Sequence, residues 1–353
     1  MLLVLILALL ASACAPEDPI RSHASAPAPV ARIRGIWLSP AQVQLLPVTG
    51  PAWERVRSAA GNRGRANIAD QDSDHDVRTL AAALVYARTG DRSYRTAAAD
   101  AILAAVGTER GGRTLALARN LVSYVVAADL IDLRGLNAGA DRSFRLWLSS
   151  VRHQRLEGQT LHEVYLRRPN NWGTHAGASL AAVAAYLGER AELDRIATVF
   201  RGWLGDRAAY KGFRYADTSW QADPGRPVGV NPAGARKAGR SIDGALPEEL
   251  RRGCSFQWAP CRTGYTWGAL QGAVVNAQIL SRQGYDTWNW QQRALLRTIR
   301  FHQRVDRTFG GWWAEGDDAW IVPLVNRAYG SSFPISAVVG EGKNMAFTDW
   351  THG

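Results

Sequence analysis

Residues 77–106 read VRTLAAALVYARTGDRSYRTAAADAILAAV, and this stretch indicates the fold class. Apolar residues recur at helical spacing in both halves, as at Leu80 and Leu84 in the first. Between the halves, Gly90 suits the C-cap of one helix and Asp91 the N-cap of the next. The stretch therefore predicts a hairpin of two helices.

The same helical pattern returns along the chain, with breaks at Gly188 and Gly284 between paired segments. It covers residues 115–133, 178–187, 191–204, 267–280 and 288–305. Helical hairpins that recur every 40–50 residues, about the length of known helical repeats, favour an α-solenoid or an α/α toroid. Because the segments share no repeat consensus, we predict a mostly all-α fold, an incomplete α/α toroid built from helical hairpins.

Residues 205–266 interrupt this pattern. They are rich in glycine, proline and aromatic residues, and no alternating strand run is evident before the C-terminal region. A loop of this length inside a domain is uncommon and often functional. We therefore expect residues 205–266 to form a long active-site loop.

The N-terminus predicts export. Residues 1–13, MLLVLILALLASA, have the length and apolar character of a signal peptide and are too short to span a bilayer. Cys14 follows directly, as in a bacterial lipoprotein signal, although Ala11-Ser12-Ala13 also suits ordinary cleavage. Residues 14–32 fit a flexible tether and residues 33–353 a catalytic domain. We expect a periplasmic or cell-surface protein with a lipid anchor at Cys14, or a secreted one.

The remaining cysteines, Cys254 and Cys261, are seven residues apart. In an exported protein such a pair predicts a local disulfide. Two cysteines without a neighbouring histidine or third cysteine do not make a tetrahedral zinc site. We expect neither a metal nor a cofactor.

Composition and charge narrow the function classes. With 46% hydrophobic and 21% charged residues, the chain is neither disordered nor collagen-like. It has 42 Lys+Arg against 31 Asp+Glu, a formal net charge of +11. Codon usage in a GC-rich genome would explain many arginines, but a basic field also attracts a polyanion. Export argues against nucleic acid, so an acidic polysaccharide is the expected partner.

The first chemical motif is RRPNNWGTH, residues 167–175. Pro169 disfavours helix before it, and an asparagine is a good N-cap after it. A helix that starts at Asn170 or Asn171 places Asn171 and His175 one turn apart on the same face. This pair suits binding of a carboxyl group and transfer of a proton. The alternative is that the asparagines only cap the helix and His175 packs in the core.

The second motif is DGALPEELRRG, residues 243–253, which alone would also fit a turn and a solvated helix. Together the two motifs resemble the alginate lyase family of α/α-toroid polysaccharide lyases. Members carry Asn-Asn-His at a helix start and later Asp-Gly-x-Leu-Pro-x-Glu-x-x-Arg-Gly, followed by a tyrosine. The second pattern is matched at Asp243, Gly244, Leu246, Pro247, Glu249, Arg252 and Gly253.

This resemblance implies roles for individual residues. Asn171 would neutralise the uronate carboxylate with help from Arg252. Tyr265 would donate a proton to the leaving oxygen and is a candidate for the base. Trp172 stands where the family has histidine, so His175 is a substitute candidate for the base. The Cys254–Cys261 loop intervenes before Tyr265, which is the nearest tyrosine after Arg252.

The lyase reaction explains these residue types. A lyase removes the C5 proton of a 4-linked uronide, next to a carboxylate. Donors aimed at that carboxylate stabilise the enolate-like charge of the transition state, as in an oxyanion hole. A histidine or tyrosine takes the proton, and a tyrosine or water returns one to the leaving oxygen.

Further residues are expected to contact the sugar chain, arginines through carboxylates and tryptophans by stacking. The substrate-binding candidates are Asn170, Trp172, Arg168, Arg251, Trp258 and Trp267. We expect the protein to act as a monomer and to meet the membrane only through the lipid anchor.

Two other functions stay open. A toroid glycoside hydrolase would need a carboxylate pair, drawn from Asp217, Asp223, Asp243, Glu248 and Glu249. A non-catalytic, polysaccharide-binding surface lipoprotein would explain why Trp172 replaces a catalytic histidine.

Overall fold

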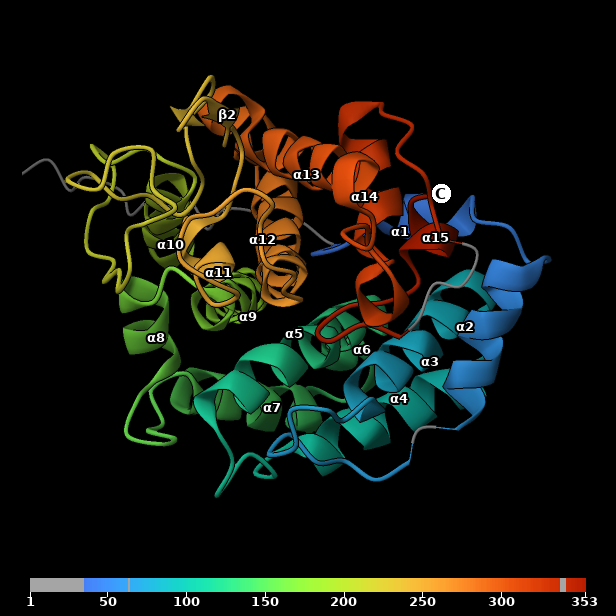
Figure 1. Cartoon of the computed structure of the whole chain (residues 1–353). Coiled ribbons are helices and arrows are strands. Elements are labelled where there is room, and N and C mark those ends of the chain that lie inside the picture. Colours follow the sequence, from blue (N-terminus) through green and yellow to red (C-terminus); the bar gives the residue numbers. More distant parts are fainter. Residues whose placement is uncertain (1–34, 63, 337–340) are drawn as a thin grey trace, which may run out of the picture. The chain divides into compact units, whose positions relative to one another are not determined.

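A computed structural model describes residues 35–62, 64–336 and 341–353 (Figure 1). The mostly helical fold that the sequence predicts is confirmed. The longer helices are α2 (Pro51–Gly61), α3 (His75–Thr89), α4 (Arg92–Ala105), α5 (Thr114–Leu130), α7 (Ala138–Val151), α9 (Asn171–Leu187), α10 (Arg190–Trp203), α12 (Tyr265–Arg282) and α13 (Trp290–Phe309). The shorter ones are α1 (Pro40–Gln44), α6 (Leu133–Leu136), α8 (Leu161–Arg167), α11 (Pro247–Leu250), α14 (Ile321–Tyr329) and α15 (Thr348–Thr351), with the 3₁₀ turns η1 (Thr287–Asn289) and η2 (Gly316–Asp318).

The predicted hairpin of α3 and α4 forms with the expected caps. Gly90 ends α3 at φ 77°, in the left-handed region that glycine enters without steric cost. The Asp91 side chain accepts a hydrogen bond from Ser93 N and starts α4. The paired helices α9/α10 and α12/α13 also match the predicted breaks at Gly188 and Gly284.

Helices α9 and α12 pack very closely because glycine lies at their contact. A Cβ added at Gly272 of α12 would lie 2.4 Å from the backbone nitrogen of His175. A Cβ added at Gly177 of α9 would lie 2.4 Å from the Tyr165 ring of α8. Only glycine allows these approaches, so the α9 backbone is fixed against both neighbours.

The helix contacts form a circuit that Figure 1 lets the reader follow. Helix α2 packs on α3, α3 on α5, α5 on α9, and α9 on α12. From α12 the contacts continue through α14 and α15 and return to α2. This circuit is compatible with the predicted incomplete toroid.

Residues 205–266, which were predicted to form a long loop, contain short regular elements. Two short antiparallel strands, β1 (Arg236–Lys237) and β2 (Arg240–Ser241), and helix α11 lie within them. Apolar side chains of this region join α13 in a second buried cluster of Trp220, Ala235, Ile242, Ala245, Leu250, Phe301, Val305 and Trp312. The disulfide Cys254–Cys261 is confirmed, with the two Cα atoms 5.7 Å apart.

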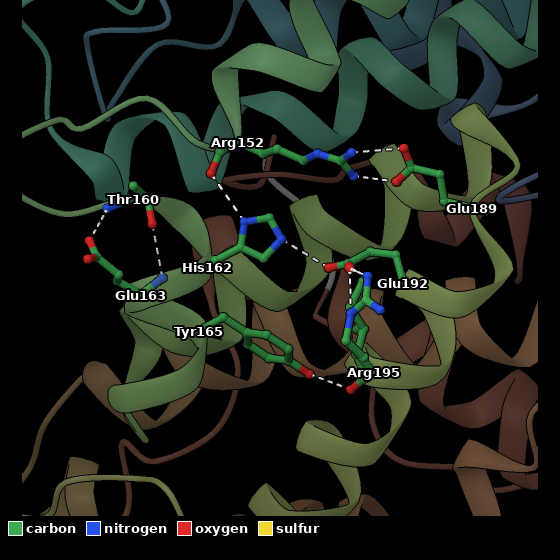
Figure 2. Close-up of polar contacts among 9 residues, drawn as sticks. Arg152, Thr160, His162, Glu163, Tyr165, Glu189, Glu192 and Arg195 are labelled. Atoms are coloured by element: carbon green, nitrogen blue, oxygen red, sulfur yellow. Dashed lines mark hydrogen bonds and ion pairs between the residues drawn. The ribbon is translucent and has the colours of Figure 1, made fainter.

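A polar network ties α8 to its neighbours just before the Asn-Asn motif (Figure 2). His162 Nε2 lies 3.0 Å from Glu192 Oε1 of α10, and Glu192 also pairs with Arg195. Tyr165 donates a 2.7 Å hydrogen bond to the carbonyl of Ile196. Because α8 is held at both contacts, the turn that leads into α9 has a fixed position.

The signal peptide, Cys14 and the tether predicted for residues 1–32 lie outside the described residues. Within the described part of the chain, no helix combines the length and hydropathy that a membrane crossing needs.

Candidate active site

The Asn-Asn motif opens α9 as the sequence predicts. Asn170 is the N-cap, and its side chain accepts a hydrogen bond from Trp172 N. Asn171 is the first helical residue and is only 3% exposed. A Cβ at Gly173 would lie 1.8 Å from the carbonyl oxygen of Arg168, so the glycine of this motif lets the chain turn tightly into the helix.

The second motif meets the first at Asn171. Arg252 Nη1 donates a 3.0 Å hydrogen bond to Asn171 Oδ1 and another of 3.0 Å to Glu249 Oε2. The other oxygen of Glu249 accepts a hydrogen bond from the backbone nitrogen of Asn171. Glu249 therefore holds both the amide-bearing residue and the guanidinium.

The Asn171 amide keeps its donor side open. With Oδ1 accepting from Arg252, the Nδ2 group lies toward Gly268 of α12, where an added Cβ would be 3.8 Å away. The hydrogen bonds found among the described residues include none that Nδ2 donates. The arrangement thus presents an amide donor beside a guanidinium, a pair that suits a carboxylate.

Tyr265 stands over this pair as the first residue of α12. The Arg252 guanidinium carbon lies 3.1 Å from the centre of the Tyr265 ring. Tyr265 is 44% exposed, whereas Asn171 and Glu249 are buried. The N-terminus of α12 and that of α9 flank Arg252, and helix N-termini favour negative charge. The site therefore combines a positive field with an accessible phenol.

Burial raises the pKa of Glu249 to about 7, against the opposing effect of the Arg252 guanidinium. Its side chain is 1% exposed. An ionised Glu249 can accept from both Asn171 N and Arg252, whereas a protonated one loses an acceptor position. The positions of Asn171 and Arg252 therefore depend on whether Glu249 is ionised.

Trp172, the residue after Asn171, has cationic neighbours. The guanidinium carbon of Arg168 lies 4.3 Å from the Trp172 ring centre, and that of Arg113 lies 4.9 Å from it. Arg168 also donates a 2.8 Å hydrogen bond to Gln159 Oε1. Trp172 and Arg168, both predicted to contact substrate, lie beside Asn171 in this basic surface.

His175 occupies a different position from the other predicted catalytic residues. It is 0% exposed, and its Nδ1 lies 3.0 Å from Asn344 Nδ2. Burial lowers the pKa of His175 well below its ordinary value, with help from the charges of Arg119 and Lys343. The structure thus encloses the His175 imidazole within protein, one turn below Asn171.

Three other substrate-binding candidates point elsewhere. Arg251 forms an ion pair with buried Glu248. Trp267 is 4% exposed and donates its indole N–H to the carbonyl of Trp312 at 2.8 Å. Trp258 packs its ring 6.0 Å from that of Phe309. Among the described contacts, none joins these side chains to Asn171, Arg252 or Tyr265.

The carboxylates that a glycoside hydrolase would draw on each form an ion pair or a hydrogen bond within the protein. Asp243 pairs with Arg297 at 2.7 Å, and Glu248 and Glu249 pair with Arg251 and Arg252. The remaining two accept local hydrogen bonds, Asp217 from Ser219 and Ser255 and Asp223 from Gly225. The geometry does not single out an exposed acid–base pair among them.

Sequence reasoning missed two contributors. Glu249 matched the family pattern, but no role followed from the match. Arg113, the N-cap of α5, stacks on Trp172 although the two are far apart in sequence. Spacing alone offers no signal for either contact, since both arise where separate helices meet. In the described residues, no group of three or more His, Cys, Asp or Glu side chains could hold a metal ion.

Comparison with known proteins finds a family that resembles part of the chain. No curated protein matches this chain at the level that marks a relative. Residues 50–215, which include the Asn-Asn motif and Trp172, match the family model described as alginate lyase. Over these residues the chain is alginate lyase-like, and the match indicates a polysaccharide lyase.

Proposed function

We propose that this protein is an exported lyase that cleaves a uronate-containing polysaccharide, alginate-like or glucuronan-like, by β-elimination without a metal ion. The observation that carries the proposal is the hydrogen bond from Arg252 to Asn171 Oδ1. It turns the amide so that Nδ2 and the guanidinium both remain available to one carboxylate.

The bound carboxylate is where charge develops. When the C5 proton leaves, its electron pair delocalises toward the carboxylate, and fixed donors stabilise that charge without reorganising. The pair then forms the C4–C5 double bond while the C4–O bond of the glycosidic link breaks. The leaving oxygen takes a proton, so proton and electrons balance.

We assign both proton transfers to Tyr265. Its ring lies against Arg252 and its side chain is exposed, whereas the other candidate, His175, is enclosed by protein. A tyrosinate that takes the C5 proton becomes the phenol that protonates the leaving oxygen. One residue can therefore complete the cycle.

The proposed location outside the cytoplasm rests on two features. Residues 1–13 have signal-peptide character and precede Cys14, the proposed lipid anchor. The Cys254–Cys261 disulfide is of a kind that persists in oxidising compartments. A net charge of +11 suits an acidic polymer as the partner, bound by a monomer.

The test is incubation of the mature protein, with chelator present, with a panel of uronate polymers. The ultraviolet absorbance of the unsaturated uronyl product should rise with at least one polymer. The variants Y265F and R252A should abolish that rise while Y94F, a matched tyrosine change on α4, leaves it intact. New reducing ends without the absorbance would indicate a hydrolase, and binding without cleavage would indicate a non-catalytic lipoprotein.

A further inference from the structure

Helix α13 carries arginines that the proposed reaction does not use. The helix has five arginines and one acidic residue, Asp306. Arg293, Arg300 and Arg307 are exposed and follow one another at intervals of seven residues, and we call these three residues the arginine row. Among the described residues, the row takes part in no ion pair, side-chain hydrogen bond or ring contact. Three positive charges therefore lie along one helix without a partner.

The other two arginines of α13 have structural partners. Arg297 is buried and pairs with Asp243 at 2.7 Å. Arg304 donates a 3.0 Å hydrogen bond to the carbonyl of Asp243. The carboxylate of Asp306 accepts hydrogen bonds from two backbone nitrogens just after the helix. The polar groups of α13 that serve the fold are thus distinct from the arginine row.

The arginine row has a cost within the helix. Like charges three or four residues apart destabilise a helix, and Arg304 stands in that relation to both Arg300 and Arg307. Arg307 gains stability from the negative end of the helix dipole because it lies in the last turn, but Arg293 and Arg300 lie too far from that end. The fold therefore gives no reason for the whole row, which favours a partner outside the chain.

The arginine row borders a groove of about 400 Å³. One wall is the last residue of α14 and the turn after it, residues 329–333, and the other wall is α13 (Figure 1). The α13 wall consists of residues at intervals of three and four, which follow one stripe of a helix: Arg293, Leu296, Arg300, Gln303 and Arg307. The groove thus combines a line of cations with the amide of Gln303 and the hydroxyl groups of two serines on the opposite wall.

The groove lies on a different side of α13 from the candidate active site. The inner face of α13 carries His302, which is buried and packs its ring 4.8 Å from the Trp267 ring of α12. Tyr265 begins that same helix. At about 100° of turn per residue, Arg300 lies about 200° around α13 from His302. The arginine row therefore faces away from α12, and no residue of the candidate active site lines the groove.

The arginine row runs toward the end of the fold that carries the active site. Arg307 lies near the end of α13, five residues before Trp312. The Trp312 carbonyl accepts a 2.8 Å hydrogen bond from the indole of Trp267, two residues after Tyr265. Arg300 lies about 10.5 Å further back along the helix axis. A chain that lies along the row and reaches the active site must therefore be long, whereas a short oligosaccharide fills the active site alone.

We propose that the arginine row is a second, non-catalytic binding site for the acidic polysaccharide, outside the active site. The ligand class rests on the proposed function. A polyuronate carries a carboxylate on each sugar, so it meets the separated guanidinium groups at several points of one chain. A single exposed ion pair contributes little, but several contacts to the same chain reinforce one another.

The groove suits a polysaccharide better than a membrane. Leu296 and Phe333, the apolar residues of its lining, are buried, so they are not available to enter a bilayer. The amide of Gln303 and the serine hydroxyl groups donate and accept hydrogen bonds, as sugar hydroxyl groups require. The charge and the polar lining therefore point to one class of ligand.

The experiment compares three triple variants. R293Q/R300Q/R307Q removes the row, and R293K/R300K/R307K keeps its charge. The control, R92Q/R134Q/R142Q, removes three exposed arginines of α4, α6 and α7 and so lowers the net charge equally. Binding of long alginate and glucuronan is measured in the Y265F background, where cleavage does not interfere. Cleavage of the long polymers and of their tetrasaccharides is measured with Tyr265 present.

Loss of the row should weaken binding of the long polymer about 10- to 100-fold at low salt. The difference should shrink between about 0.01 and 0.15 M salt, because screening shortens the reach of exposed charges. KM for the long polymer should rise while kcat and the kcat/KM for the tetrasaccharide stay at the wild-type level. The lysine variant should retain most of the binding, and all variants should melt within a few degrees of wild type.

Three results would overturn the inference. Equal losses in the glutamine variant and the control would assign the effect to net charge. A loss of the same size on the tetrasaccharide would assign it to a disturbed active site. Unchanged polymer binding, with a loss confined to phosphatidylglycerol vesicles, would assign the row to a membrane surface.

Failure of the proposed function has a different signature. If wild type binds a polymer through the row but releases no unsaturated product, the lyase mechanism fails and the second site stands. If wild type cleaves and the glutamine variant binds the long polymer equally well, only the second site fails. If wild type binds neither polymer, both proposals are overturned.

Discussion

Arg252 Nη1 donates a 3.0 Å hydrogen bond to Asn171 Oδ1 across 81 residues of sequence. The bond joins the two motifs into one carboxylate-binding group. It also fixes the orientation of the amide, since an Oδ1 that accepts from arginine leaves Nδ2 as the donor. The relationship explains why an asparagine, with one acceptor and one donor end, occupies this place.

Replacing Asn171 by aspartate tests this orientation. N171D keeps the acceptor for Arg252 and so should keep the fold, but it replaces the amide donor by a negative charge. We expect kcat/KM to fall by about 10²–10³-fold, as when an oxyanion-hole donor is removed. The thermal midpoint should stay within a few degrees of wild type. Cleavage at the wild-type rate would contradict the assignment of Asn171.

Glu249 predicts a pH dependence of activity. Its pKa of about 7 lies above the ordinary glutamate value of 4.5, so the carboxylate that holds Asn171 and Arg252 forms only as pH rises through 7. We expect kcat/KM to increase about tenfold between about pH 6 and pH 8, following one ionisation. E249Q should be less active and should lack this rise. A rise of the same size in E249Q would assign it to another group.

The raised pKa of Glu249 also determines how the free energy of unfolding changes with pH. Because the pKa of Glu249 is higher in the folded state than in the unfolded state, protonation of Glu249 favours folding. This contribution to the free energy of unfolding is fully present below pH 4.5 and is lost as pH rises through about 7. Urea unfolding of wild type and E249Q across this range measures it. The stability of wild type relative to E249Q should decline as pH rises, and a constant difference would count against the buried, ionising Glu249.

Glu192 is expected to change the free energy of unfolding with pH in the opposite direction. The hydrogen bond from His162, and then that from Arg195, lowers the pKa of Glu192 to about 2 (Figure 2). Its contribution is therefore present above the ordinary value of 4.5 and is lost as pH falls toward 2. At neutral pH, E192Q should lose about 1.5–3 kcal/mol of unfolding free energy. Circular dichroism in urea at pH 7 and pH 3 should show a smaller difference at the lower pH.

Gly272 predicts a packing effect. An added methyl would lie 2.4 Å from the backbone of Thr174 and His175, so G272A must push α12 away from α9. We expect a loss of at least about 1–3 kcal/mol, together with reduced activity because Asn171 and Tyr265 move apart. Gly61 at the end of α2 has nothing within 4 Å of an added Cβ, so G61A is the matched control. Equal melting temperatures for the two variants would contradict this packing.

Local signals along the chain account for most of the helices. Gly90 and Asp91 end one helix and begin the next through short-range backbone chemistry, and Pro169 with Asn170 sets the start of α9. The structure of residues 205–266 is harder to predict. It depends on burial of Trp220 and Leu250 against α13, and the segment has no regular spacing of apolar residues that would indicate a helix or a strand. A segment that is held by such long-range contacts reads as a loop when only its sequence is considered.

For the site, the order of amino acids alone establishes which residue types are present: an amide at a helix start, a Glu-x-x-Arg turn and a following tyrosine. These follow from motifs within a few residues, where spacing and capping suffice. Which of them meet is settled only by the packed fold. Packing brings Asn171, Arg252 and Tyr265 together, encloses His175, and places Arg113 against Trp172. The physical reason is that exposure and pairing depend on how separate helices pack, and the glycines that let α9 and α12 approach join segments that lie far apart in the chain.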